Sequence, residues 1–285
     1  MSGSLRVLRA ELSRTLTSWA ALFGVLMIVV IPFLWVWVGV LADRAERLQR
    51  MAEGRTYLGL SEGTGWSTMV DGWRPALMIA TALLLVQTAR SLAGDRESGV
   101  LRLAVTRSAS RSGAVVGRAL LGPVITLGMV ALSGLSAYMA ASLFGGDFGD
   151  LVEDGDMIFS AGEVMDELWR SMLPVVLGMM AVHSFGLLIS SLSRGPVIAL
   201  AASLAVVLLW DIFKEDVGDK RWYVFASHAP TFADGSGMRE LAGFSRGMSD
   251  AGMPEGVFRM GTMLSPAEAI VFVLLACLAV RRRPL

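Results

Sequence analysis

WAALFGVLMIVVIPFLWVWVGVL, residues 19–41, contains no charged side chain. Two further runs are equally free of charge, residues 119–146 and 171–193. Each of the three is long enough to cross a hydrocarbon layer of roughly 30 Å at about 1.5 Å of helix per residue. The sequence therefore predicts membrane-spanning helices, and not the soluble domains that its length alone would suggest.

Shorter uncharged runs extend this pattern along the chain. They are residues 75–89, 195–210 and 269–280. Trp73, Arg90 and Trp210 flank them, and such side chains reach the membrane interface from a short span. The composition agrees, because 54% of residues are hydrophobic and only 18% are charged, whereas roughly a quarter are charged in an average soluble domain. We expect an all-α polytopic membrane protein with spans at about 19–41, 73–92, 117–145, 171–193, 195–212 and 264–281.

The last span carries a local start signal. Ser265-Pro266-Ala267-Glu268 places a capping serine before a first-turn proline, with a glutamate at the third helical position. This pattern predicts that Glu268 lies at a helix N-terminus, where the helix dipole favours a negative charge. The alternative is a carboxyl group within the membrane that carries a proton.

The charges are sorted between the two sides of the predicted bundle, although the net charge is zero. Four stretches share one side, namely the N-terminus, residues 90–118, the 193–195 turn and the C-terminus. Together they hold 13 basic and 3 acidic residues, against 12 basic and 21 acidic on the other side, with Glu268 of the last span counted on neither. Lys and Arg accumulate on the cytoplasmic side of membrane proteins. We therefore expect both termini and residues 90–118 in the cytoplasm, in a multi-pass protein of the cell membrane.

The non-spanning segments receive separate predictions. Residues 4–18 carry leucines at helical spacing and predict a helix in the cytoplasmic interface, or alternatively an extension of the first span. Residues 42–72 and the acidic stretch 147–170 are expected as outer loops. Residues 211–263 form a long outer loop with short helical pieces, which either covers the mouth of a transport path or dips back into the membrane surface.

Several kinds of chemistry find little support. The chain has no G-x-x-x-x-G-K-[ST] loop for ATP and no H-E-x-x-H motif, and its one cysteine, Cys277, has no disulfide partner. His183 lies in the fourth span, either as a hydrogen-bonded core residue or as a proton relay. The methionines of the last outer loop are either flexible apolar filler or ligands for a soft metal ion. We expect no metal site, no cofactor in this chain and no enzymatic activity.

GDRESGVLRLAVTRSASRSG, residues 94–113, interrupts the apolar runs with a basic, amphipathic pattern. It predicts a small cytoplasmic helix whose first turn contains Asp95-Arg96-Glu97. A helix that only bound anionic lipid would not place carboxylates there, so the pattern favours docking of a soluble partner. A second helix is expected to begin near Ser110 and to continue into the third span.

These residues carry a resemblance to a known family. The pattern consists of Glu97-Ser98-Gly99-Val100-Leu101, then Ser110-Arg111, and then Gly117-Arg118 at the entry to a span. It resembles the signature of type-2 ABC transporter permeases. The family's pattern is a glutamate, Gly-Thr-Leu, leucines, Pro-x-Ser-Arg and Gly-Lys. This chain has Val100 for the threonine and Arg118 for the lysine, and it lacks the proline. Six spans and an N-terminal interfacial helix extend the resemblance, and the outline is similar to permeases that accompany nitrous-oxide-reductase maturation.

The resemblance implies that ATP binding and substrate transport belong to separate subunits. Such permeases pair with a separate ABC ATPase subunit that binds ATP, and with a second permease copy or paralogue. Residues 94–116 would be the coupling region in contact with the ATPase. The site residues carried over are Glu97, Gly99, Leu101, Arg102 and Arg111.

The expected function is therefore substrate export by the permease subunit of an ABC transporter. A membrane anchor or assembly scaffold that recruits a cytoplasmic partner is the alternative, and an intramembrane enzyme is a third. Gln87, Tyr138 and His183 are polar groups in the spans that would line a transport path. Membrane lipid is an expected partner and nucleic acid is not.

Overall fold

The computed structural model describes residues 12–13, 18–53, 64–99, 110–153, 156–232, 236–248 and 252–282. Within these ranges, six helices are long and apolar enough to cross a membrane. They are α2 (Trp19–Ala52), α3 (Gly65–Glu97), α5 (Arg111–Phe144), α6 (Ala161–Leu192), α7 (Pro196–Phe213) and α9 (Glu255–Arg282). The predicted all-α class with six spanning helices is confirmed. The predicted interfacial helix at 4–18 lies almost entirely outside the described residues.

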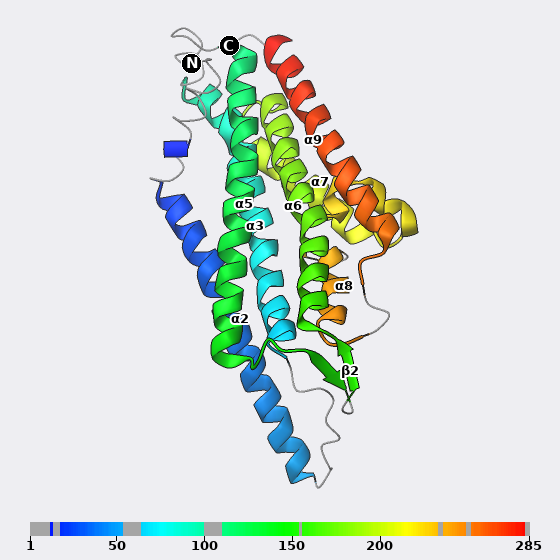
Figure 1. Cartoon of the computed structure of the whole chain (residues 1–285). Coiled ribbons are helices and arrows are strands. Elements are labelled where there is room, and N and C mark those ends of the chain that lie inside the picture. The colour runs from blue at the N-terminus through cyan, green and yellow to red at the C-terminus, as the bar shows by residue number, and fades with distance from the viewer. Residues whose placement is uncertain are drawn as a thin grey trace.

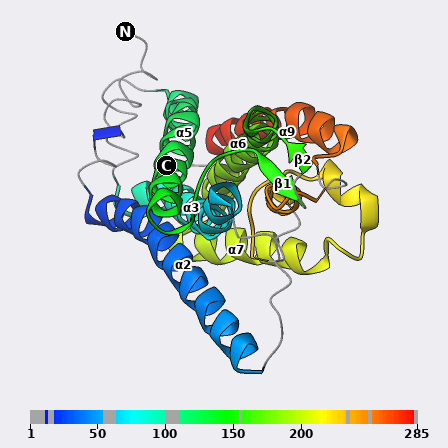
Figure 2. The same ribbon diagram turned by 60° about the horizontal axis from the view of Figure 1, so that its bottom comes forward.

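The six helices form a bundle in which each runs opposite to the one before it (Figure 1). We call one end the Glu97 end, where α3, α6 and α9 finish and α2, α5 and α7 begin. The other is the Phe213 end. Helices α3 and α6 lie at the centre, and the view turned by 60° shows α3 between α2, α5, α6 and α7 (Figure 2). Because α6 packs on α3, α5, α7 and α9, most of its side chains are buried.

Hydroxyl side chains cap four of the long helices at their N-termini. In each case the side-chain oxygen accepts a hydrogen bond from the backbone N–H three residues later, which stabilises a helix by about 1 kcal/mol. The capping residues are Ser18, Thr64, Ser110 and Ser160. Ser110 confirms the predicted start of the helix that enters the third span. Ser160 and Glu163 cap each other's backbone N–H groups reciprocally.

Several helices continue well beyond the predicted spans. Helix α2 runs on to Ala52 and α3 already begins at Gly65, so much of the predicted outer loop at 42–72 is helical. The prediction ended the first span just before Asp43 and began the second just after Asp71. Charge excludes a side chain from hydrocarbon but does not end a helix, and Arg, Glu and Gln are good helix formers in water.

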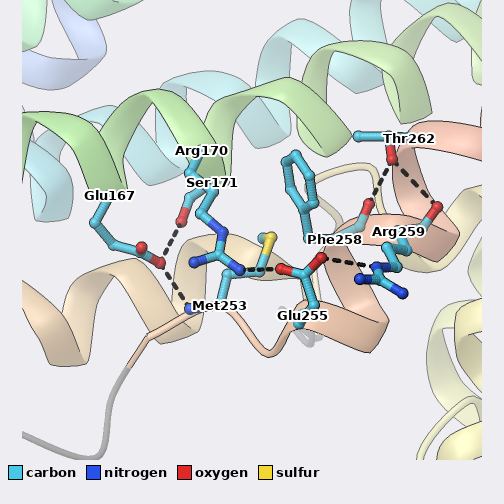
Figure 3. A network of polar contacts seen from close by, with 8 residues as sticks. All are labelled: Glu167, Arg170, Ser171, Met253, Glu255, Phe258, Arg259 and Thr262. Atoms are coloured by element: carbon cyan, nitrogen blue, oxygen red, sulfur yellow. Dashed lines mark hydrogen bonds and ion pairs between the residues drawn. The ribbon is translucent and has the colours of Figure 1, made fainter.

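The predicted N-terminus of the last span at Ser265 is wrong. Helix α9 begins ten residues earlier, at Glu255, with Pro266 inside it and Ser265 buried. Polar contacts with α6 hold its beginning in place (Figure 3). Glu167 accepts a hydrogen bond from Met253 N at 2.7 Å, and Arg170 pairs with Glu255. Pro266 cannot donate to the carbonyl of Thr262 and its ring crowds that carbonyl, but α9 continues on both sides of it. Glu268 therefore lies in mid-helix and not at a helix N-terminus.

Short elements occupy the Phe213 end. The acidic stretch predicted as a loop contains an antiparallel hairpin, β1 (Leu151–Glu153) with β2 (Asp156–Phe159), followed directly by α6. Between α7 and α9 lie two 3₁₀ helices, η1 (Gly218–Tyr223) and η2 (Phe225–Ser227), and then α8 (Gly237–Phe244). The short helical pieces predicted within residues 211–263 correspond to η1, η2 and α8.

Candidate functional site

Two charged residues fasten the last turn of α3 to its neighbours. Asp95 is 4% exposed and forms an ion pair with Arg118 of α5, which is 6% exposed. The next residue, Arg96, donates from Nη1 to Ser193 O at 2.8 Å and from Nη2 to Ser191 O at 3.2 Å. These are carbonyls at the C-terminal end of α6, where the helix dipole attracts a cation. The end of α3 is thus bound to both α5 and α6.

A buried serine extends this attachment by one turn. Ser190 of α6 is fully buried, and its Oγ accepts hydrogen bonds from the backbone N–H groups of Leu92 at 3.0 Å and Ala93 at 2.9 Å. Bonds of this kind satisfy polar groups in an apolar interior, where an unmade bond is costly. The α3–α6 contact is therefore polar as well as apolar at the Glu97 end.

Glu97 lies beside these attachments but faces away from the core. It is the last residue of α3 and is exposed, and its Oε2 is 3.9 Å from the position that a Cβ on Gly195 would occupy. Gly195 precedes the N-terminus of α7. A carboxylate near such a terminus is favoured by the helix dipole. The side chain predicted to meet the ATPase is therefore accessible at the Glu97 end.

Gly99 turns the chain out of α3. Its backbone has a φ of +74°, in the left-handed region that favours glycine, and its N–H donates to Arg96 O at 3.2 Å. The glycine of the family-like pattern thus has a clear structural role. Leu101 and Arg102 lie outside the described residues. Arg111 is the half-buried first residue of α5.

One local prediction for this region is wrong. Asp95-Arg96-Glu97 does not begin a new amphipathic helix, because these residues form the last turn of α3. The sequence could not show that Asp95 has a buried partner, Arg118, 23 residues later. This ion pair allows a carboxylate to lie in the packed last turn of α3. The rest of the predicted amphipathic helix falls on residues 100–109, which lie outside the described residues.

The three predicted path residues lie on different helices. Gln87 is half-buried on α3, whereas Tyr138 of α5 is 48% exposed and its ring lies 4.8 Å from Phe148. His183 of α6 is buried, and its Nε2 donates to Arg118 O at 3.1 Å. A Cβ on Gly122 would lie 2.4 Å from the His183 ring, so the ring fills the space over that glycine. Tyr138 is 16 residues further along α5, roughly 24 Å away at about 1.5 Å per residue. Tyr138 and His183 therefore do not share a site.

The segment between α7 and α8 packs into the bundle. The whole stretch 225–231 is buried. A Cβ on Gly178 of α6 would lie 2.8 Å from Ala229 N, and one on Gly261 of α9 would lie 2.8 Å from His228 Nδ1. The Phe225 ring contacts Phe185 and Phe272 with centroids 5.3 and 5.2 Å apart. The structure shows residues 225–231 packed against α6 and α9, which decides neither of the two alternatives predicted for this loop.

Polar contacts hold this segment against the end of α7. Lys214 is fully buried, and its Nζ lies 2.7 Å from Asp211 Oδ1 and 3.0 Å from Thr231 Oγ1. Thr231 in turn donates to Asp211. His228 donates from Nε2 to Trp222 O at 2.8 Å, and burial lowers the pKa of its ring below the ordinary value of 6.5. Sequence reasoning missed this cluster, because Lys214 and Asp211 resemble ordinary charges that follow a span.

The fold and these buried contacts define a class, an all-α polytopic membrane protein whose two ends are each held by buried ion pairs. Comparison of the chain with protein-family models and with curated proteins found no match. Among the described residues, no group of three or more His, Cys, Asp or Glu side chains is placed to hold a metal ion.

Proposed function

We propose that the chain is the permease subunit of an ATP-binding-cassette transporter, and that a separate ATPase subunit docks where α3 leads toward α5. One observation carries the proposal. Asp95 and Arg96 bind α5 and α6, while Glu97, the next residue, is exposed. A partner that binds Glu97 therefore contacts the residue directly after Asp95 and Arg96, which bind α5 and α6.

The charge distribution supports an orientation for this site. The Glu97 end carries most of the excess of basic residues, including Arg90, Arg194 and the arginines at the end of α9. By the positive-inside rule this end faces the cytoplasm, where an ATPase has access to ATP. The proposed location is the cell membrane, with both termini in the cytoplasm.

The contacts at the end of α3 suggest how movement is transmitted. Closure of an ATPase dimer would displace the docked segment, and Arg96 and Asp95 would pass that displacement to α6 and α5. Two permease copies would then alternate between inward-open and outward-open states. Only contacts that differ between the two states shift such an equilibrium, so the docking contact must change during the cycle. The direction of transport in this proposal is export.

Docking can be tested by purifying the tagged full chain together with an ATPase that has a phosphate-binding loop and hydrolyses ATP. Glu97→Ala should leave membrane insertion intact and reduce the bound ATPase at least about tenfold, which corresponds to about 1.4 kcal/mol. Glu46→Ala is the matched control, because Glu46 is an exposed glutamate on the part of α2 near the Phe213 end. Equal ATPase recovery from Glu97→Ala and the wild type would contradict the docking role.

The orientation has its own test. Cys277 is the chain's one cysteine, so a Cys277→Ala background accepts a single reporter thiol. A Glu97→Cys thiol should be protected from a membrane-impermeant maleimide added outside intact cells, and should react after the cells are opened. A Glu46→Cys thiol should show the opposite pattern. Labelling of Glu97→Cys from outside would place the docking site on the wrong side and exclude the transporter proposal.

A further inference from the structure

Glu268 is a carboxyl group in the middle of a spanning helix. It lies 13 residues after the first residue of α9 and 14 before the last, roughly 20 Å from either end at about 1.5 Å per residue. It shares the bundle-facing side of α9 with residues three to four positions apart, as expected for one face of a helix. These are Val257, Gly261, Ser265, Phe272, Ala276 and Val280.

The polar atoms at this position are incompletely satisfied. The backbone N–H of Phe225 interacts with the Glu268 carboxyl group, but Oε2 is buried and has no hydrogen-bond partner. The hydroxyl of Ser265, one turn earlier, is also buried without a partner. Within the described part of the chain, no Lys or Arg forms an ion pair with Glu268.

The elements packed on this face of α9 offer little compensating charge. From α6, the contacts come from Pro174, near Gly261, and from Phe185, near Phe272. The α5 side contributes Ala114, Val115 and Ala119 near the far end of α9. The 218–228 segment carries five titratable side chains, of which Asp219, Lys220 and Tyr223 are exposed and Arg221 and His228 are at least partly buried. Arg221 pairs with Glu215 and stacks on Trp222, and His228 packs on Gly261.

We propose that Glu268 is an intramembrane proton-binding site. An ionised carboxylate without a cation is costly in an apolar interior, and ionisable groups within membranes commonly serve proton or ion movement. A proton is the cation that neutralises Glu268 without needing a cavity. The proton is held on this half-buried carboxyl group beside the backbone N–H of Phe225, and its release requires that water reach the buried Oε2. This proposal does not depend on docking of an ATPase.

Infrared spectroscopy of the full chain in lipid nanodiscs tests the proposal directly. At neutral pH, the wild type should show the carbonyl stretch of a protonated carboxyl group, shifted in deuterated water. Glu268→Gln should lose that band, whereas Glu46→Gln should retain it, because Glu46 is exposed. If Glu268→Gln does not fold, Glu268→Asp keeps the acid on a shorter side chain and should displace the band.

Three results would overturn the proposal. The band could be absent from the folded wild type, which would mean that Glu268 is ionised. It could persist unchanged in Glu268→Gln, which would assign it to another acid. It could also appear only after sodium is removed, which would make Glu268 a sodium site. All three are measured on the permease alone, so failure of the ATPase proposal would leave them unaffected.

Discussion

Asp95–Arg118 and Asp211–Lys214 are both buried ion pairs, but the first connects two helices and the second lies at the end of a single helix. The first joins α3 to α5 across 23 residues of chain, beside an exposed glutamate. The second joins two residues at the C-terminal end of α7. Through a hydrogen bond to Thr231, it anchors the buried segment 225–231. The Glu97 end is thus built to hold helices together. The Phe213 end is built to hold a segment of short 3₁₀ helices and turns against them.

The largest expected effect tests the contact between helices. Asp95→Ala removes the carboxylate from a buried guanidinium, and breaking a buried pair in this way costs about 3–5 kcal/mol. The free energy of unfolding, measured by detergent-induced denaturation, should fall by that amount. Asp95→Ala with Arg118→Met should recover most of the loss, because no buried charge remains. A double variant no more stable than the single one would contradict this account.

The next effect tests the segment at the other end. Thr231→Val keeps the shape of the side chain but removes the hydroxyl that bonds to Lys214 and Asp211, at a cost of about 1.5–3 kcal/mol. Amide hydrogen exchange should accelerate in residues 218–231 and remain unchanged at the α3–α5 contact. Thr262→Val is the control, because its hydroxyl bonds only within α9. Equal acceleration at both ends of the bundle would break the distinction between them.

A pair of glycine substitutions tests how closely the segment is enclosed. Gly178→Ala places a methyl group 2.8 Å from Ala229 N and 2.9 Å from His228 C, which are backbone atoms. Overpacking of this kind typically costs about 1–3 kcal/mol. Gly128→Ala on α5 meets nothing within 4 Å and should stabilise by up to about 1 kcal/mol through helix propensity. Thermal unfolding of both variants provides the measurement, and equal melting temperatures would show that the segment adjusts easily.

The smallest effect is a dependence on pH. The pKa of His228 is lowered in the folded chain, so below pH 6.5 the unfolded state binds a proton that the folded state does not. Stability should fall as the pH drops from 6.5 toward the lowered pKa of the folded-state ring, with a slope of at most about 1.4 kcal/mol per pH unit. His228→Gln should flatten this slope between pH 6.5 and 5.5. If both proteins lose stability in parallel, other groups cause the acid effect.

The sequence predicts the six spans because water-soluble domains rarely contain uncharged runs of this length. It fails where a charged or polar residue finds a partner far along the chain. Asp95 can be buried in the last turn of α3 because it forms an ion pair with Arg118. At the start of α9, Glu167 accepts a hydrogen bond from Met253 N and Arg170 pairs with Glu255. The inward course of residues 225–231 depends on glycines of two distant helices, which no local pattern reveals. The turn at Gly99 follows from its positive φ, whereas the burial of Asp95 and the hydrogen bonds from Arg96 to α6 are visible only in the fold.

The glycines that enclose the 225–231 segment limit what can replace it. Gly178 on α6 has no side chain where the backbone of Ala229 and His228 lies, and Gly261 on α9 has none where the His228 ring lies. If the segment withdrew toward α8, neither helix would have atoms with which to fill the space. The result would be unfilled space beside Gly178 and Gly261, on the face of α9 that also carries Ser265 and Glu268.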